Sequence, residues 1–266
     1  MDNIKRYLKL YSLFIKVSIV ELMSHRFNLM MSALANIVWT MGQLISLKFL
    51  FSKIDTFQGW EFKDMILLLV FSQIYVYLFV IIFFKNFREL PKKLISGELD
   101  MILTKPVNRY FILTFKSVSI PQIIPMFVTV IPLAIYGLSG TQNINLLVSL
   151  NSIIIFILGF IAIYFVNLIL ISLSFYIDNA HMFRDLVGTS IENFARIPLG
   201  TLHKILRVTM MVILPVAFVS FYPAKLFRDG EIYLEVYLVE ICMIVIFYII
   251  SKILWDKGLK KYSGVG

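Results

Sequence analysis

Long apolar runs separated by short polar stretches dominate the chain. Five runs are long enough to cross the roughly 30 Å hydrocarbon core of a bilayer as a helix that rises about 1.5 Å per residue, and a sixth is slightly short. This pattern predicts an all-α polytopic membrane protein in which residues 1–266 form a single transmembrane domain. We expect six transmembrane helices at about 27–51, 65–84, 111–138, 146–177, 208–223 and 235–253.

Two of these runs are interrupted by proline. The run at 111–138 contains three prolines and the short run at 208–223 contains Pro215. Each proline removes a backbone donor and can kink a helix. Residues 178–207 between the fourth and fifth runs carry too many charges for a span, so we expect a loop there.

The amino-terminal segment, residues 1–26, has a different pattern. Its polar residues share one side of a helical wheel, while apolar residues occupy the rest. This arrangement is typical of a helix that lies in the membrane interface with its lysines toward headgroups. No apolar core precedes a small-residue cleavage site, so we expect no cleavable signal peptide. The polar side consists of Lys5, Lys9, Ser12 and Lys16.

A charged connection between the second and third runs is the most informative stretch. Apolar residues recur at helical spacing before Gly97, the residue type that most often ends a helix in a left-handed conformation. Charged residues cluster after it, and they cannot lie in hydrocarbon. We predict a short amphipathic helix from Lys85 to Ser96 at the membrane surface, and a solvated loop is the alternative. The residues concerned are Phe87, Leu90 and Leu94 before the glycine, and Glu98, Asp100 and Lys105 after it.

Composition and charge support a membrane protein with a defined orientation. The 266 residues are 59% apolar and 15% charged, well below the roughly 25% charge of soluble domains. If the amino terminus is cytoplasmic, the positive-inside rule is satisfied, because all but five of the 25 lysines and arginines fall on that side. The net charge of +9 therefore requires no nucleic-acid partner. The residues on the other side are Lys48, Lys53, Lys63, Lys225 and Arg228.

Motifs for chemistry are absent from the sequence. There is no phosphate-binding GxxxxGK[ST] loop, no GxSxG elbow and no HExxH pair. The chain is therefore not expected to hydrolyse ATP or to bind a cofactor or metal. Glu240 is the one acidic residue well inside a run, where a carboxylate is costly unless it is paired, protonated or near the interface. Pairing with Lys48 and a role in ion coupling are two interpretations, beside a purely structural one.

Three stretches carry a resemblance to a known family: GELDMILTKPVNRYF from Gly97, IENFARIPL from Ile191 and ILPVAFVSFYPAKLF from Ile213. In this order and spacing, and with six spans, the chain resembles the permease subunit of bacterial type 2 ABC exporters. The resemblance implies a transport subunit without its own ATPase site, in the bacterial plasma membrane, with both termini cytoplasmic. It also implies two copies of a separate ATPase that binds ATP and Mg, and a second permease, identical or sister.

The resemblance also assigns roles to segments. In that family the amino-terminal helix is an elbow helix, and the loop between spans two and three carries the coupling helix that seats in the ATPase. The substrate is not identified, although aromatic, uncharged spans favour an amphiphilic, drug, peptide or lipid-like cargo. The residues expected to serve ATPase coupling are Phe87, Leu90, Leu94, Gly97, Glu98, Leu99, Asp100, Lys105 and Pro106.

A polar stripe in the first run has two interpretations. Its members recur at steps of four, four and three, and so share one helical face. They either hydrogen-bond to neighbouring helices within the subunit or, as the resemblance implies, border the pathway or the second permease together with a bend in the fifth span. The residues are Ser32, Asn36, Thr40 and Gln43, with Pro215 and Pro223 for the bend.

Two other classes of protein remain as alternatives. An ion-coupled secondary transporter usually has broken helices in matching halves and midplane ionisable residues, and the two three-span halves show no such pairing. An intramembrane enzyme would need converging polar catalytic groups, and the second and fourth spans contain no ionisable residue.

Overall fold

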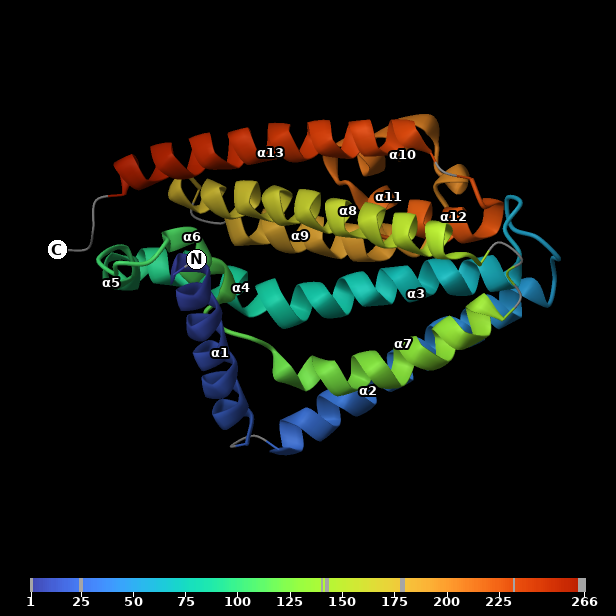
Figure 1. Ribbon diagram of the computed structural model, residues 1–266, viewed down its shortest axis with the longest axis horizontal. Helices are drawn as coiled ribbons and strands as arrows, with labels where there is room; N and C mark the ends of the chain where they lie inside the picture. Colours follow the sequence, from blue (N-terminus) through green and yellow to red (C-terminus); the bar gives the residue numbers. More distant parts are fainter. Residues whose placement is uncertain are drawn as a thin grey trace.

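The computed structural model describes residues 2–23, 26–139, 141, 144–177, 180–231 and 233–262. In this part of the chain the regular structure is helical, apart from one isolated bridge between Phe57 and Trp60. The long helices lie roughly side by side along one axis, and α1 crosses their direction (Figure 1). The α-helices are α1 Asp2–Met23, α2 Arg26–Phe51, α3 Phe62–Phe79, α4 Lys85–Ile95, α5 Glu98–Leu103, α6 Arg109–Phe115, α7 Ile123–Leu138, α8 Leu146–Ser172, α9 Ala180–Phe194, α10 Lys204–Val208, α11 Val216–Val219, α12 Phe221–Asp229 and α13 Leu234–Lys261.

Short π-helical and 3₁₀ segments connect several of these helices. Two π-helical segments, η1 Val80–Phe84 and η5 Thr209–Ile213, follow α3 and α10. The 3₁₀ turns are η2 Ile120–Gln122, η3 Leu173–Phe175 and η4 Leu199–Thr201.

Within the described residues, five helical segments are long and apolar enough to cross a membrane. The prediction of an all-α polytopic membrane protein is confirmed. Four of the predicted spans are single helical segments at the expected places, and the last helix, α13, continues eight residues beyond residue 253. The segments are Met30–Phe51, Phe62–Leu94, Ile120–Leu138, Leu146–Phe175 and Leu234–Lys261.

The third span is shorter than predicted. Residues 111–115 belong to α6, residues 116–119 are irregular, and the spanning segment starts at Ile120. Pro121 has no N–H to donate to the carbonyl of Ser117, so one helix cannot continue through this stretch. The Ser117 carbonyl accepts instead from Asn86 Nδ2 at 2.7 Å.

The fifth span was predicted wrongly as one helix over 208–223. The chain breaks at Leu214, which has φ −115° and ψ 66°, and again at Ser220. Pro215 prevents a continuous helix because it lacks a donor. The short α11 between the breaks is fully buried against α8, where a Cβ on Gly159 would lie 2.6 Å from the Cβ of Phe218. Only glycine permits this close approach, and α11 becomes part of the core.

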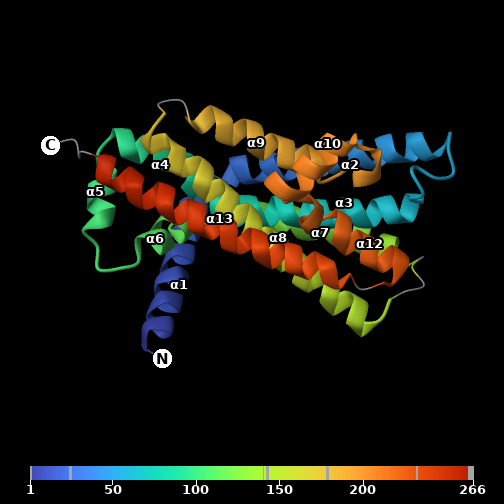
Figure 2. The ribbon, with the colours of Figure 1, turned by 90° about the horizontal axis from the view of Figure 1, so that it is seen from above.

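Residues 180–207 are not the loop that their charges predicted. Helix α9 lies beside α8 in Figure 1 and diverges from it in Figure 2, and the two helices are in contact. Ile191, Ala195 and Leu199 are buried in the main core with α11. Four of the six charged residues of this segment line cavities, whereas Lys204 and Arg207 are exposed; the four are Arg184, Asp185, Glu192 and Arg196. The predicted start of the loop, Asp178, lies outside the described residues.

Helix α1 confirms the predicted amino-terminal helix. Its Tyr7 and Tyr11 rings pack edge-on against Phe111 and Phe115 of α6, at centroid distances of 4.7 and 5.8 Å. The start of α1 and the end of α13 both lie toward the end of the molecule that carries α4 and α5 (Figure 1).

Candidate coupling site at the α4–α5 end

The predicted amphipathic helix and its glycine stop are both present. Helix α4 covers Lys85–Ile95, and Gly97 follows with a left-handed φ of 74°. The chain then turns into the short helix α5. However, α4 is not separate from the second span, because η1 joins it to α3 without a loop. The rod from α3 through α4 therefore reaches α5 at its tip.

The apolar face of α4 is buried inside the subunit. Phe87, Leu90, Leu94 and Leu99 are at most 8% exposed, and they pack with residues of α6, α8 and α13. These four side chains therefore face the interior of the subunit, and their part in ATPase coupling stays a prediction. Their physical role is to hold α4 and α5 on the bundle, at roughly 1.5 to 3 kcal/mol for each fully buried large side chain. The neighbours in this cluster include Ile112, Leu113, Leu168, Ile171 and Trp255.

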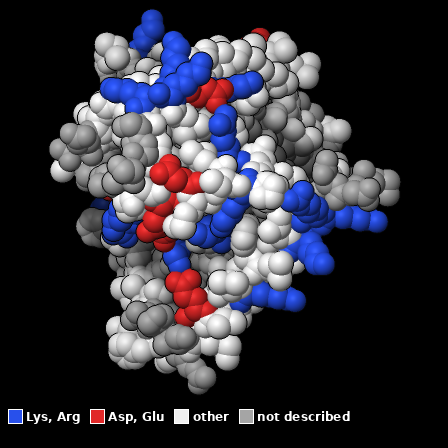
Figure 3. Space-filling view, turned by 90° about the vertical axis from the view of Figure 1, so that its left-hand side faces the viewer, with Lys and Arg blue, Asp and Glu red and all other residues white. Residues whose placement is uncertain are grey.

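The surface of α5 is what this end presents to solvent. Glu98 and Met101 are exposed, Met101 at 63%, while Asp100 is half-buried beside Tyr262. Figure 3 looks onto this end of the molecule, where lysine and arginine side chains surround a few acidic ones. Burial, and then the nearby charges of Lys93 and Lys105, lower the pKa of Lys116. The other exposed residues are Leu103, Thr104, Lys105 and Pro106.

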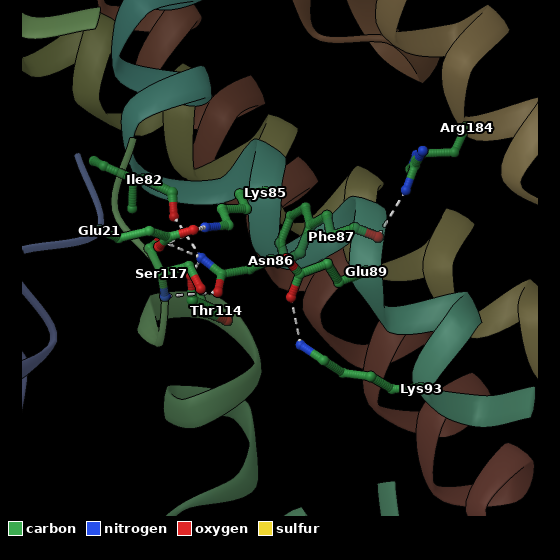
Figure 4. Close-up of polar contacts among 10 residues, drawn as sticks. All are labelled: Glu21, Ile82, Lys85, Asn86, Phe87, Glu89, Lys93, Thr114, Ser117 and Arg184. Carbon is green, nitrogen blue, oxygen red and sulfur yellow. Dashed lines mark hydrogen bonds and ion pairs between the residues drawn. The ribbon is translucent and has the colours of Figure 1, made fainter. Parts of the chain in front are cut away.

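A proline inside α4 explains one hydrogen-bonded contact between α4 and α9; contacts of this kind, which hold α4 to its neighbours, are called braces below. Pro91 cannot donate to the carbonyl of Phe87. The Nη1 of Arg184 on α9 donates to that carbonyl at 2.6 Å (Figure 4). Its Nη2 donates to Asp185 at 2.5 Å. The Arg184 side chain is only 9% exposed. A buried guanidinium thus occupies the gap that the proline leaves in the helix.

Two neighbouring residues attach the start of α4 to other elements. The Nδ2 of Asn86 donates to the carbonyls of Ile82, Thr114 and Ser117, and its Oδ1 accepts from the Ser117 N–H at 2.9 Å (Figure 4). Lys85 pairs with Glu21 of α1 at 2.7 Å. The junction between α3 and α4 is therefore joined to α1, to the α6–α7 connection and to α9.

Further contacts join the α5–α6 loop to both ends of the chain. Arg6 of α1 donates to the Pro106 carbonyl at 2.8 Å, and the N–H of Asn108 donates to the Tyr7 hydroxyl at 3.0 Å. Arg109 pairs with Asp256 of α13 at 2.8 Å. A displacement of α5 would therefore act on α1 and α13 as well as on α3.

The polar stripe of α2 turns mainly toward other helices of the same chain. Asn36 Nδ2 donates to Gln122 Oε1 at 3.1 Å, the side chain of Gln43 lies 3.0 Å from that of Gln73, and Thr40 is 4% exposed. Ser32 accepts from Asn36 at its backbone carbonyl, at 2.7 Å.

The two prolines of the expected bend lie elsewhere in the molecule. Pro215 and Pro223 are buried, and the Pro223 carbonyl accepts from Ser152 of α8 at 3.2 Å. The cleft beside α2 is lined by Gln43 and by neither proline. The structure therefore does not bring the stripe and the prolines together on one face.

Glu240 does not pair with Lys48. Lys48 is exposed on α2, whereas Glu240 is fully buried on α13, and neither carboxylate oxygen has a hydrogen-bond partner among the described residues. In the same part of the chain, no group of three His, Cys, Asp or Glu side chains is placed to hold a metal ion.

Sequence reasoning missed Asn86, Arg184 and Arg196 as functional candidates. For Arg184 a signal was present, because Pro91 inside a predicted helix requires an outside donor for the Phe87 carbonyl. Which residue supplies it depends on contacts across 97 positions of the chain.

Comparison with known proteins agrees with this arrangement. Residues 37–266 match a family model described as ABC-2 family transporter protein. No curated protein and no solved structure matches the chain. The match covers most of the chain and includes every helix from α3 to α13. This multi-pass membrane protein, a permease of an ABC transporter, therefore belongs to the ABC-2 transporter family.

Proposed function

We propose that the chain is the permease of an ATP-driven exporter that moves an amphiphilic substrate outward. Family membership implies an ABC ATPase as partner. In this proposal two ATPase subunits bind ATP and Mg, this chain binds neither, and a second permease, identical or sister, completes the complex. The complex lies in a bacterial plasma membrane, with the α4–α5 end and both termini in the cytoplasm.

The observation that carries the proposal is the exposed tip formed by α5. A six-residue helix presents Glu98 and the apolar side chain of Met101 at the end of the bundle, while its other face is buried. An exposed methionine beside a carboxylate suits a cleft that has an apolar pocket and a basic group. We assign this contact to the ATPase.

The braces around α4 supply the path by which motion would travel. Coupling requires a partner that contacts the two states of the permease differently. Movement of the ATPase would press on α5 and pass into α3 through the continuous α4 rod. It would pass to α1 through Lys85 and Glu21, and to α9 through Arg184.

Replacing exposed residues of α5 tests the proposal. Asp100 is partly covered by Tyr262, so Glu98→Lys with Met101→Glu changes the surface without disturbing packed side chains. A charged contact at such an interface is worth about 2 to 5 kcal/mol when buried, equal to a loss of roughly 30-fold or more in affinity. The tagged chain, purified from its native host, should recover an ABC ATPase that the double variant does not recover.

The matched control is Glu235→Lys at the start of α13, an exposed acidic residue at the opposite end of the molecule. This variant should recover the ATPase and stimulate its ATP hydrolysis as the wild-type chain does. Equal recovery of the ATPase by the α5 double variant and the wild-type chain would contradict the assignment of α5.

A further inference from the structure

A cleft opens beside α2, away from the α4–α5 end. Its volume is about 610 Å³, within the range of pockets that hold drug-sized ligands. Most of its lining is apolar. The residues that matter here are Trp39, Gly42 and Gln43 of α2, Met65 and Leu69 of α3, and Arg196.

Arg196 lies at the depth of the membrane-spanning helices. It follows α9, whose 15 residues span about 22 Å from the α4–α5 end. It meets Trp39, which is in the middle of α2, with its guanidinium carbon 5.9 Å from the indole centroid. A cation at this depth is costly and is a functional candidate by default.

The guanidinium of Arg196 is incompletely satisfied. Its Nε is buried without a hydrogen-bond partner, and none of the ion pairs among the described residues includes it. When the Gln43 amide turns its oxygen toward it, that oxygen accepts from Arg196 Nη1 at 3.3 Å and from Trp39 Nε1 at 2.5 Å. Glu192, one turn earlier, interacts electrostatically with Arg196 but lines a separate cavity with Arg184 and Arg88. The cleft therefore has a positive charge on its wall and no carboxylate in its lining.

The open side of the cleft lies on the outer face of α2. Val38 and Trp39 are each 60% exposed there, and Ile45 and Phe49 continue the apolar surface along the helix. An apolar chain can lie along this surface while a charged group reaches inward. A ligand with both parts is an amphiphile, and the charge complementary to Arg196 is negative.

We propose that this cleft binds an anionic amphiphile, with its phosphate or carboxylate on Arg196 and its alkyl chain along α2. The proposal rests on the transport function above and names the class of substrate for it. Gln43 and Trp39 hold the guanidinium in place. The charged hydrogen bond should favour an anion over a neutral analogue by about 10- to 100-fold.

Trp39 provides a direct readout of binding. The full-length permease in phosphatidylcholine nanodiscs is titrated with bromine-labelled hexadecyl phosphate, and with the matched bromine-labelled hexadecanol. Binding at the cleft is measured as the quenching of Trp39 alone, which is the quenching of the wild-type chain minus that of Trp39→Phe. We expect the phosphate to quench at concentrations about 10-fold or more below those of the alcohol. Arg196→Lys should keep most of this preference, and Arg196→Gln should lose it.

Steric variants on α2 provide a second test that does not depend on Arg196. A Cβ added at Gly42 would have no other atom within 4 Å, and Gly42 lines the cleft, so Gly42→Phe should fill the cleft and abolish quenching by the phosphate. Met30→Phe adds the same ring at an exposed position near the start of α2, away from Ile45 and Phe49, and should leave quenching unchanged.

Three results would overturn the proposal. Equal quenching by the phosphate and the alcohol in the wild-type chain would mean that no headgroup is recognised. A preference that persists in Arg196→Gln would place the anion elsewhere. If inorganic phosphate displaced the alkyl phosphate at an equal concentration, the cleft would be an anion site in which the alkyl chain of the ligand contributes nothing to binding. The assay contains no ATPase, so any of these results would leave the coupling role of α5 standing, and failure of the α5 test would not affect the cleft.

Discussion

Two arginines near opposite ends of α9 differ in the hydrogen-bond and ion-pair partners that the helix bundle provides for their side chains. Arg184 donates to the Phe87 carbonyl and to Asp185, and its side chain is almost fully buried. Arg196 has no ion pair among the described residues, and its buried Nε lacks a partner. The difference comes from the neighbours, because Pro91 leaves a free backbone carbonyl opposite Arg184, whereas the acceptor beside Arg196 is the neutral Gln43 amide. We infer that Arg184 is a brace and Arg196 is an open binding group.

The regions around the two arginines differ in the same way. The α4 junction is covered by α1, α6 and α9, with direct polar contacts to each. The cleft is covered on one side only, and the outer face of α2 is exposed. A region with several contacts can transmit a displacement, whereas a region covered on one side can accept a ligand or a second subunit.

The largest expected effect is at Arg184. Arg184→Gln should destabilise the chain by about 3 to 5 kcal/mol, because it breaks a buried charged contact and leaves the Phe87 carbonyl unsatisfied. Thermal unfolding of the purified chain measures the effect. Asp185→Asn is the control, and it should cost far less because the Asp185 side chain is 59% exposed.

The proline offers a rescue that only the proposed brace predicts. In Pro91→Ala the new N–H can donate to the Phe87 carbonyl, which restores the helical hydrogen bond that the proline removes. Combined with Arg184→Gln, it should recover at least about 1 kcal/mol of the lost stability. No recovery in the double variant would show that Arg184 acts through something other than this carbonyl.

A much smaller effect is expected at Arg196. Arg196→Met should change the free energy of unfolding by no more than about 1 kcal/mol, or raise it, because replacing a poorly satisfied buried charge by an apolar side chain is often neutral or stabilising. The same thermal unfolding assay applies. A loss as large as that of Arg184→Gln would make Arg196 a second brace and remove the contrast between the two regions.

The smallest effect is expected at Glu240. A fully buried carboxyl whose oxygens have no partner among the described residues is stable only in the uncharged form. Glu240→Gln keeps the shape and the lack of charge, so stability should change by less than about 0.5 kcal/mol. A clearly larger loss would indicate that the carboxyl is charged and pairs with a group that the isolated subunit lacks.

Much of the α4–α5 region could be predicted from neighbouring residues alone. The spacing of Phe87, Leu90 and Leu94 predicted the helix, and Gly97 predicted its end. The same spacing did not reveal what covers that face, which in the structure is the core of the subunit. Helical periodicity says which residues share a face, but burial depends on segments such as α8 and α13, which are far away in the sequence.

By itself, the sequence determined the membrane class, the positions of most long helices and the turn at Gly97. These features depend on run length, average hydropathy and the backbone freedom of single residues, all of which are local. Only the tertiary structure decided the course of residues 180–223, where α9 packs along α8 and α11 inserts at Gly159. A charged residue is tolerated inside a bundle when a distant group satisfies it, as the Phe87 carbonyl does for Arg184. Local composition cannot show that partner, because the two residues meet only after the helices have packed.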